Sequence, residues 1–316
     1  IRFYQVSTLC GVRIVTDSNR QIRIDTPTMQ NDSQQQFSEW IGKTQSASNT
    51  LTIAPMEGLA ATLDRDNSAF SLGDTLPPLW HWLYFLEPSK QSELAEDGHP
   101  HRGDFLPPIP LPRRMWAGSR LNFIRPLLAG ATIGRSSAIQ SIKLKQGRSG
   151  SLGFVCVAHE LSDSSGVLLR EEHDIVYRGT PTGNVSTLPP LKADEDHDFA
   201  RTVTPDAILL FRYSALTFNG HRIHYDRAYA KDVESYPGLV VHGPLLATFL
   251  LELFADNYPD AALSGFSFKA IRPVFDIESF RVCGNKPDNT GNAKLWIADN
   301  AGNLCMEARV ELANRQ

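Results

Sequence analysis

A short polar segment, residues 219–226, carries the side chains best suited to chemistry in this chain. It reads Asn-Gly-His-Arg-Ile-His-Tyr-Asp, so an amide, two imidazoles and a carboxylate follow one another closely. An imidazole titrates near neutral pH, and an amide can hold a water molecule as both donor and acceptor. These are the groups that add water to a polarised carbonyl compound, and we therefore expect an enzyme.

The roles within this segment follow from the chemistry of each side chain. His224 suits the acid/base step, whereas Asn219 does not titrate and is expected to hold the attacking water. On an extended chain His224 and Asp226 lie on the same side, so Asp226 would orient the imidazole or carry the second proton. A helix N-cap ahead of Arg227 is an equally good interpretation of Asp226.

The spacing of His221, His224 and Asp226 is also that of a metal cluster on a helix. No further His, Cys or Glu ligand stands nearby in the sequence, and short histidine patterns often occur by chance. We therefore expect no metal. His221 and Arg222 are interpreted as residues that bond the backbone at a bend or contact the substrate.

A second motif, Val-Val-His-Gly-Pro at 240–244, precedes an apolar run that ends at Phe254. Proline suits the first turn of a helix, so the motif places the N–H of Gly243 at the positive end of a helix dipole, where it can face the oxygen of a polarised carbonyl. An ordinary helix start is the other interpretation. The two valines before His242 favour a packed histidine, which we count as substrate-binding rather than catalytic.

The elements around both motifs follow from hydrophobic periodicity. An antiparallel sheet curled around one helix would explain why the longest apolar run is hydrophobic on nearly all sides. The pattern predicts an α+β protein with the hot-dog architecture. The expected elements are a strand in 202–218, a helix over 239–254, and strands near 266–282, 293–299 and 303–312.

The N-terminal half repeats this plan weakly. Residues 123–127 (Phe-Ile-Arg-Pro-Leu) echo 270–274 (Ala-Ile-Arg-Pro-Val), and 166–171 echo 302–307 in the same order. Each echo follows a helix-like segment, which is Leu79–Glu87 in the first half. Chance is the competing explanation, but two echoes in the same order favour a duplication. The prediction is a double hot-dog, with two antiparallel sheets that each wrap around a long central helix.

Composition indicates where the domains begin and end. Met29 and the polar run after it are typical of a natural start, so the preceding residues are interpreted as a non-native extension and left out of the functional argument. The proline-rich segment 97–112 is expected to be an ordered, functional loop laid over a surface. The expected boundaries are an N-terminal extension at 1–36, an N-terminal hot-dog domain at 37–180, a linker at 181–198 and a catalytic hot-dog domain at 199–316.

Bulk properties exclude several classes of protein. The chain has 31 Lys+Arg against 35 Asp+Glu without a long block of like charge, so nucleic acid is not an expected partner. The four cysteines show no pairing pattern, which favours a reduced cytoplasmic protein, or a mitochondrial-matrix protein in a eukaryote. The longest apolar stretch, 239–254, is interrupted by polar residues and too short to cross a bilayer, so we expect no membrane association.

Residues 214–226, Ser-Ala-Leu-Thr-Phe-Asn-Gly-His-Arg-Ile-His-Tyr-Asp, resemble the active-site segment of the type 2 hydroxyacyl-thioester dehydratases. They resemble more generally the MaoC-like R-specific enoyl-CoA hydratases (hydratase 2). In the hydratase 2 pattern His224 takes the place of the catalytic histidine. Asn219 stands where that pattern has the catalytic aspartate, His221 where it has asparagine and Arg222 where it has proline.

This resemblance implies a double hot-dog enzyme that adds water to an α,β-unsaturated acyl thioester, most nearly in the branch that converts mesaconyl-C4-CoA or itaconyl-CoA to citramalyl-CoA. It implies that Gly243 supplies the oxyanion donor and that the N-terminal half closes an acyl tunnel. It implies no cofactor beyond the CoA of an acyl-CoA substrate, or an acyl-carrier thioester in its place, and is compatible with a homodimer. A dicarboxylate-derived acyl group would need a cation, and the candidates are Arg113, Arg114, Arg120 and Arg222.

Two functions of other classes stay open. A hot-dog thioesterase would also polarise a thioester carbonyl, with Asp226 as its central carboxylate. A catalytically silent thioester-binding module would be consistent with Asn219 in place of aspartate. Release of free thiol from an acyl-CoA would indicate the first function, and tight binding without turnover the second.

Overall fold

The computed structural model describes residues 5–9, 12–16, 22–24, 37–66, 69–147, 150–179 and 189–313. The chain divides into two units, Ile1–Glu39 and Trp40–Gln316. The expected linker at 181–198 lies partly outside the described residues. In the first unit, three short strands form a small antiparallel sheet of their own. They are β1 (Gln5–Leu9), β2 (Val12–Thr16) and β3 (Ile22–Ile24).

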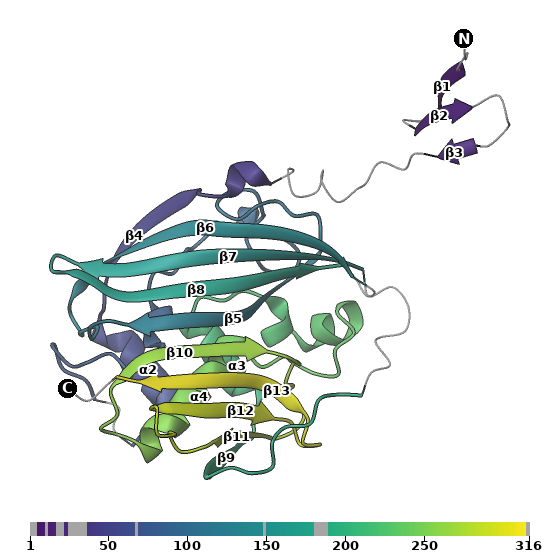
Figure 1. The fold of residues 1–316 in the computed structure, drawn as a ribbon. Helices are drawn as coiled ribbons and strands as arrows, with labels where there is room; N and C mark the ends of the chain where they lie inside the picture. The colour runs from purple at the N-terminus through teal and green to yellow at the C-terminus, as the bar shows by residue number, and fades with distance from the viewer. Residues whose placement is uncertain are drawn as a thin grey trace. The chain divides into compact units, whose positions relative to one another are not determined.

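The second unit is built on one antiparallel sheet of ten strands in the order β4-β6-β7-β8-β5-β10-β13-β12-β11-β9, which lie side by side (Figure 1). The elements of its N-terminal half are η1 (Ser38–Trp40), β4 (Thr44–Thr50), α2 (Ile53–Thr62), the 3-10 turns η2 (Trp80–Leu83) and η3 (Gln91–Glu93), β5 (Arg113–Phe123), β6 (Thr132–Gly147), β7 (Gly150–Asp163) and β8 (Gly166–Arg178). Those of its C-terminal half are β9 (Phe199–Val203), α3 (Ala207–Leu216), η4 (Arg222–His224), the π-helical turn η5 (Tyr229–Val233), α4 (Gly243–Asn257), β10 (Leu263–Ala270), β11 (Phe280–Gly284), β12 (Asn292–Ala298) and β13 (Leu304–Leu312).

The two halves share one plan and meet in the middle of the sheet. Strand β5 of the first half pairs with β10 of the second, with Leu121 opposite Phe266. The echoed Ile-Arg-Pro runs occupy equivalent places. Ile124 and Arg125 both donate their backbone N–H to one carbonyl oxygen on β8, and Ile271 and Arg272 do the same to one on β13. This confirms the double hot-dog architecture, with the two five-stranded parts merged into a continuous sheet.

The central helix of the C-terminal half is the predicted one. Every residue of α4 from Leu245 to Phe254 is buried, which explains why this run is apolar on nearly all sides. Within the described residues, no helix is long and apolar enough to span a membrane.

The equivalent helix of the N-terminal half is much shorter than predicted. The Leu76 N–H bonds to the carbonyl of Leu127, as the Val241 N–H does to that of Val274, so the next residues should correspond to α4. They form only the 3-10 turn η2, because the backbone leaves the helical region directly after it: Tyr84 is extended and Phe85 has a positive φ of 56°. The long central helix expected at Leu79–Glu87 is therefore wrong.

The strand predicted in 202–218 ends at Val203, and helix α3 follows it, so this prediction is wrong beyond Val203. Asp206 has extended backbone angles, and its carboxylate accepts the N–H of Leu209 at 2.8 Å, so it caps the start of α3. Helix α3 packs on α2, and a Cβ at Gly58 would lie 2.7 Å from the Leu216 side chain. The last turn of α3 leads directly into the polar segment 219–226.

Candidate active site

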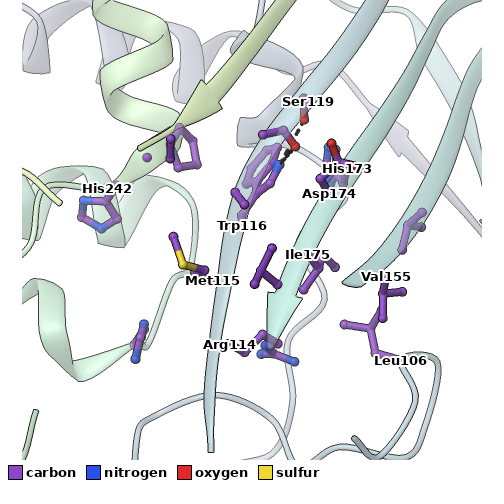
Figure 2. Close-up of a pocket in the computed structure, with 18 of the residues that line it drawn as sticks. Leu106, Arg114, Met115, Trp116, Ser119, Val155, His173, Asp174, Ile175 and His242 are labelled. Carbon is purple, nitrogen blue, oxygen red and sulfur yellow. Dashed lines mark hydrogen bonds between the residues drawn. The ribbon is translucent and has the colours of Figure 1, made fainter. Parts of the chain in front are cut away.

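One cavity of about 2010 Å³ is lined by residues of both halves. The C-terminal half contributes Asn219, His221, Ile223 and His224 together with the start of α4. The N-terminal half contributes the proline-rich loop together with β5 and β8. Figure 2 shows one part of the lining, where Arg114, Met115 and Trp116 follow one another along β5 and His242 faces them from the other half.

His224 is held in this cavity as a neutral imidazole. It lies in the short turn η4 and is 8% exposed. Its Nδ1 lies 2.7 Å from the carbonyl oxygen of Val240, which can only accept, so Nδ1 carries the hydrogen and Nε2 keeps a free lone pair. Burial lowers the pKa of His224 to about 4. The side chain is thus ready to accept a proton at neutral pH.

His242 is a packed residue that supports His224. The two rings stack with their centroids 3.7 Å apart and their planes at 16°. Nε2 of His242 lies 2.8 Å from the hydroxyl of Ser214, and burial lowers the pKa of His242 well below its usual value. The ring therefore fixes the plane of the His224 imidazole while remaining neutral.

Asn219 and Gly243 come from the two motifs singled out in the sequence. Both line the cavity. The Asn219 side-chain oxygen accepts the N–H of His221 at 3.0 Å, so the amide hydrogens are the part that remains available to a water molecule. Gly243 is the first residue of α4, where backbone N–H groups have no partner within the helix. Its N–H is available to a ligand oxygen.

Asp226 does not orient His224. Its carboxylate forms an ion pair with Arg222 at 2.7 Å and accepts the N–H of Tyr229 at 3.0 Å. It therefore caps the following turn, which was the second interpretation of this residue, while a backbone carbonyl takes the orienting place beside the imidazole. Arg222 is fully engaged there and does not line the cavity, so its assignment as a substrate contact has no geometric support.

A second polar pair, Asp97 and His99, comes from the N-terminal half and was not among the residues predicted from the sequence. Nδ1 of His99 lies 3.0 Å from the Asp97 carboxylate, and the His99 ring lies 4.1 Å from that of His221. The backbone carbonyl of Asp97 accepts the N–H of Arg222. Gly98 is required for this contact, since a Cβ there would lie 1.9 Å from the carbonyl oxygen of Gly220. The available signal was Asp-Gly-His-Pro-His at the start of the loop expected to be functional.

The charges of this polar group are defined by burial and pairing. Burial, with smaller contributions from His99 and His224, lowers the pKa of His221 to about 2. Burial also lowers the pKa of His99, against the opposing bond to Asp97. Burial alone would raise the pKa of Asp97, but hydrogen bonds from His99 outweigh it and hold that pKa low. The result is one ionised carboxylate beside neutral imidazoles.

The residues that could hold a metal ion differ from those suggested by the spacing. Asp97, His99 and His221 offer ligand atoms within 4.8 Å of one another, whereas Asp226 is turned away to Arg222. The positive charge of Arg114 acts on both histidines, which disfavours a further cation at this place.

Comparison with known proteins identifies the family. A profile of the family described as hydroxyacyl-thioester dehydratase type 2 matches residues 79–276. The chain is 46% identical over 274 residues to the mesaconyl-C(4)-CoA hydratase of Chloroflexus aurantiacus, across 86% of this chain and 96% of that protein. The chain belongs to the type 2 hydroxyacyl-thioester dehydratase family. It is therefore a hydro-lyase of the hydratase/dehydratase type.

Other members and solved structures agree with this assignment. The chain is 30% identical to the mitochondrial hydroxyacyl-thioester dehydratase type 2 of Schizosaccharomyces pombe, across 78% of this chain and 90% of that protein. A MaoC-like dehydratase from Phytophthora capsici has a TM-score of 0.65 at 14% identity, covering 87% of this chain and 97% of that one. A Mycobacterium tuberculosis protein described as a double hot-dog has a TM-score of 0.55 at 12% identity, covering 86% and 96%. These two likenesses concern the fold.

Proposed function

We propose that this type 2 dehydratase hydrates a short unsaturated acyl-CoA that carries a second carboxylate, of the mesaconyl-C4-CoA or itaconyl-CoA kind, to a citramalyl-CoA product. The observation that carries the proposal is the neutral, backbone-oriented His224 in the same cavity as the free N-terminus of α4. Similarity to the Chloroflexus aurantiacus hydratase along nearly its whole length supports the choice of substrate.

Each step of the reaction has a candidate group in this arrangement. Nε2 of His224 takes a proton from water as the water oxygen bonds to the β-carbon, and the amide of Asn219 holds that water. The double-bond electrons move toward the thioester oxygen, whose developing charge the N–H of Gly243 stabilises. The imidazolium, still donating from Nδ1 to the Val240 carbonyl, then returns the proton to the α-carbon. All atoms of the water are retained in the product.

This chemistry uses only the side chains and backbone of the protein and the CoA of the substrate. The N-terminal half contributes Met115 and Trp116 of β5 to the wall of the cavity, which supports the proposal that it closes the acyl tunnel. We propose a cytoplasmic or mitochondrial-matrix location, where acyl-CoA substrates are made. We also propose a homodimer, which a measurement of molecular size in solution would test. An acyl-carrier thioester is the alternative substrate, and its competition with CoA thioesters would test that.

The direct test is a panel of mesaconyl-C4-CoA, itaconyl-CoA and crotonyl-CoA. Mass spectrometry follows all three, and loss of the ultraviolet absorbance of the conjugated thioester follows mesaconyl-C4-CoA and crotonyl-CoA, since the double bond of itaconyl-CoA is not conjugated with its thioester. We expect an increase in product mass by one water without release of free thiol. Release of free CoA would instead indicate a thioesterase, although Asp226, the carboxylate such an enzyme would need, is committed to Arg222. Tight binding with no change in absorbance would indicate a silent binding module.

A further inference from the structure

The proposed substrate class places strict demands on one cation, and this inference rests on the proposed function. In a C4 thioester of mesaconate the free carboxylate is attached to the β-carbon, the same carbon that the water attacks. A group that recognises this carboxylate must therefore lie beside the catalytic histidines. The phosphates of CoA are separated from the reacting carbons by the whole pantetheine arm, so a cation beside the histidines is out of their reach.

Four of the arginines that line the cavity, Arg113, Arg120, Arg135 and Arg309, already have a carboxylate partner, and Arg222 beside it has one too. Such pairs are neutralised, and breaking one to bind a ligand would cost the pairing energy. Arg102 is committed in another way, because it donates to the backbone carbonyls of Ile109, Leu111 and Pro112 and so holds the proline-rich loop. The carboxylate pairs are Arg113–Glu234, Arg120–Glu172, Arg120–Asp174, Arg135–Glu87, Arg222–Asp226 and Arg309–Glu311.

Three other arginines that line the cavity, Arg114, Arg178 and Arg272, have no carboxylate partner among the described residues. Of these three, Arg114 is the one whose charge acts on the histidines of the site. It lies on β5 opposite Tyr177 of β8 and lines the cavity, where Figure 2 shows it next to Ile175. Among the described residues, no carboxylate lies within ion-pair distance of Arg114, and its charge acts on both His99 and His221. Asp97, the carboxylate of that group, is bonded to His99 instead.

We propose that Arg114 binds the free carboxylate of the acyl group and thereby selects dicarboxylate-derived thioesters. A guanidinium can bind a carboxylate through two parallel hydrogen bonds, which would fix the β-carbon in front of the water held between Asn219 and His224. The surrounding histidines are neutral, so they do not compete for the anion. The sequence offered four arginines for this task, and the pairing pattern of the fold leaves Arg114 for it.

The test compares substrates that differ only in this carboxylate. Arg114→Gln should lower kcat/KM for mesaconyl-C4-CoA by about 10²–10³-fold while changing kcat/KM for crotonyl-CoA by less than about threefold, because crotonyl-CoA has no carboxylate to lose. Arg114→Lys keeps the positive charge but loses the planar guanidinium that can form two parallel hydrogen bonds. Its kcat/KM for mesaconyl-C4-CoA should therefore lie between those of the wild type and Arg114→Gln. Arg113→Gln, the adjacent arginine already paired with Glu234, is the matched control and should leave the ratio between the two substrates unchanged.

Binding gives a second measurement that does not depend on turnover. Succinyl-CoA and butyryl-CoA are saturated analogues in which a carboxylate and a methyl group occupy the same position. The wild-type chain should bind succinyl-CoA more tightly, and Arg114→Gln should abolish that preference. Equal losses on both members of each pair, or a preference that survives the substitution, would overturn the role of Arg114. Failure of the wild-type chain to hydrate any of these thioesters would instead overturn the proposed function.

Discussion

The two halves of the sheet each bury a group of histidines, and the groups differ in how they are paired. In the N-terminal half, Glu171 accepts from His81 at 2.9 Å and from the indole of Trp82 at 3.1 Å. Burial would raise the pKa of Glu171, but His173 and His81 outweigh it and hold that pKa well below its usual value. In the C-terminal half, the hydrogen-bond partner of His224 among the described residues is a backbone carbonyl, and the rings of His242 and His221 lie beside it.

This contrast teaches what separates a structural histidine from a reactive one. A carboxylate fully bonded by histidine and tryptophan stabilises the fold and has no group left for a substrate. A neutral imidazole with one free lone pair, beside the end of a 15-residue helix, can accept a proton and act next to an oxyanion donor. The equivalent turn in the N-terminal half has four residues, too few to supply such a helix end.

The largest effect is expected in the C-terminal group. His224→Ala should lower kcat by at least about 10²–10⁴-fold, the usual contribution of one acid/base group, with little change in acyl-CoA binding. His197→Ala changes an exposed histidine outside the cavity and serves as the control. A near-normal rate for His224→Ala in the ultraviolet assay would remove this residue from the mechanism.

The N-terminal group should affect stability rather than chemistry. Glu171→Gln removes a buried charge from its partners and should lower the free energy of unfolding by on the order of 3 kcal/mol, measured by denaturant titration. Its neighbour Glu172 is a surface carboxylate paired with Arg120, and Glu172→Gln should cost less than about 1 kcal/mol. Equal effects of the two substitutions would contradict the structural role of Glu171.

The two groups should also respond in different pH windows. The folded pKa of Glu171 is depressed, so its contribution to stability is present above the unfolded carboxyl pKa and is lost as the pH falls below it. His224 has a folded pKa of about 4, below the usual histidine value of 6.5, so unfolding takes up a proton between these values. Its contribution is lost as the pH falls from about 6.5 to about 4.

Stability curves from pH 7 down to about pH 2 can separate these contributions. His224→Ala should flatten the part between pH 6.5 and about pH 4, and Glu171→Gln the part below pH 4.5. The basic form of His224 should persist to about pH 4, so the acid limb of kcat/KM should not have its midpoint near 6.5. If kcat/KM halves near pH 6.5 because His224 becomes protonated, then His224 is more solvated than the structure indicates.

Metal removal is expected to have the smallest effect. Prolonged dialysis against a strong chelator should leave the hydratase rate unchanged, because the proposed steps use only imidazole, amide and backbone groups. Loss of activity that zinc restores would show instead that Asp97, His99 and His221 are ligands. Inductively coupled plasma analysis of the dialysed protein is the accompanying measurement.

The sequence by itself determined the features that depend on local order along the chain. The apolar run with Pro244 at its start predicted helix α4, the repeated Ile-Arg-Pro runs predicted the duplicated plan, and the types of residue at 219–224 predicted acid/base chemistry. These signals are readable because helix starts, apolar faces and side-chain chemistry are properties of neighbouring residues.

Only the tertiary structure decided which groups are paired and which are free. Asp226 is four residues from Arg222 and pairs with it, while Val240, from another segment, takes the place beside His224. The Asp97–His99 pair reaches the site from the other half of the chain. The choice of Arg114 depends on carboxylates brought to its neighbours by other elements. Pairing of polar groups is set by distance in space and by burial, and neither quantity can be read from spacing along the chain.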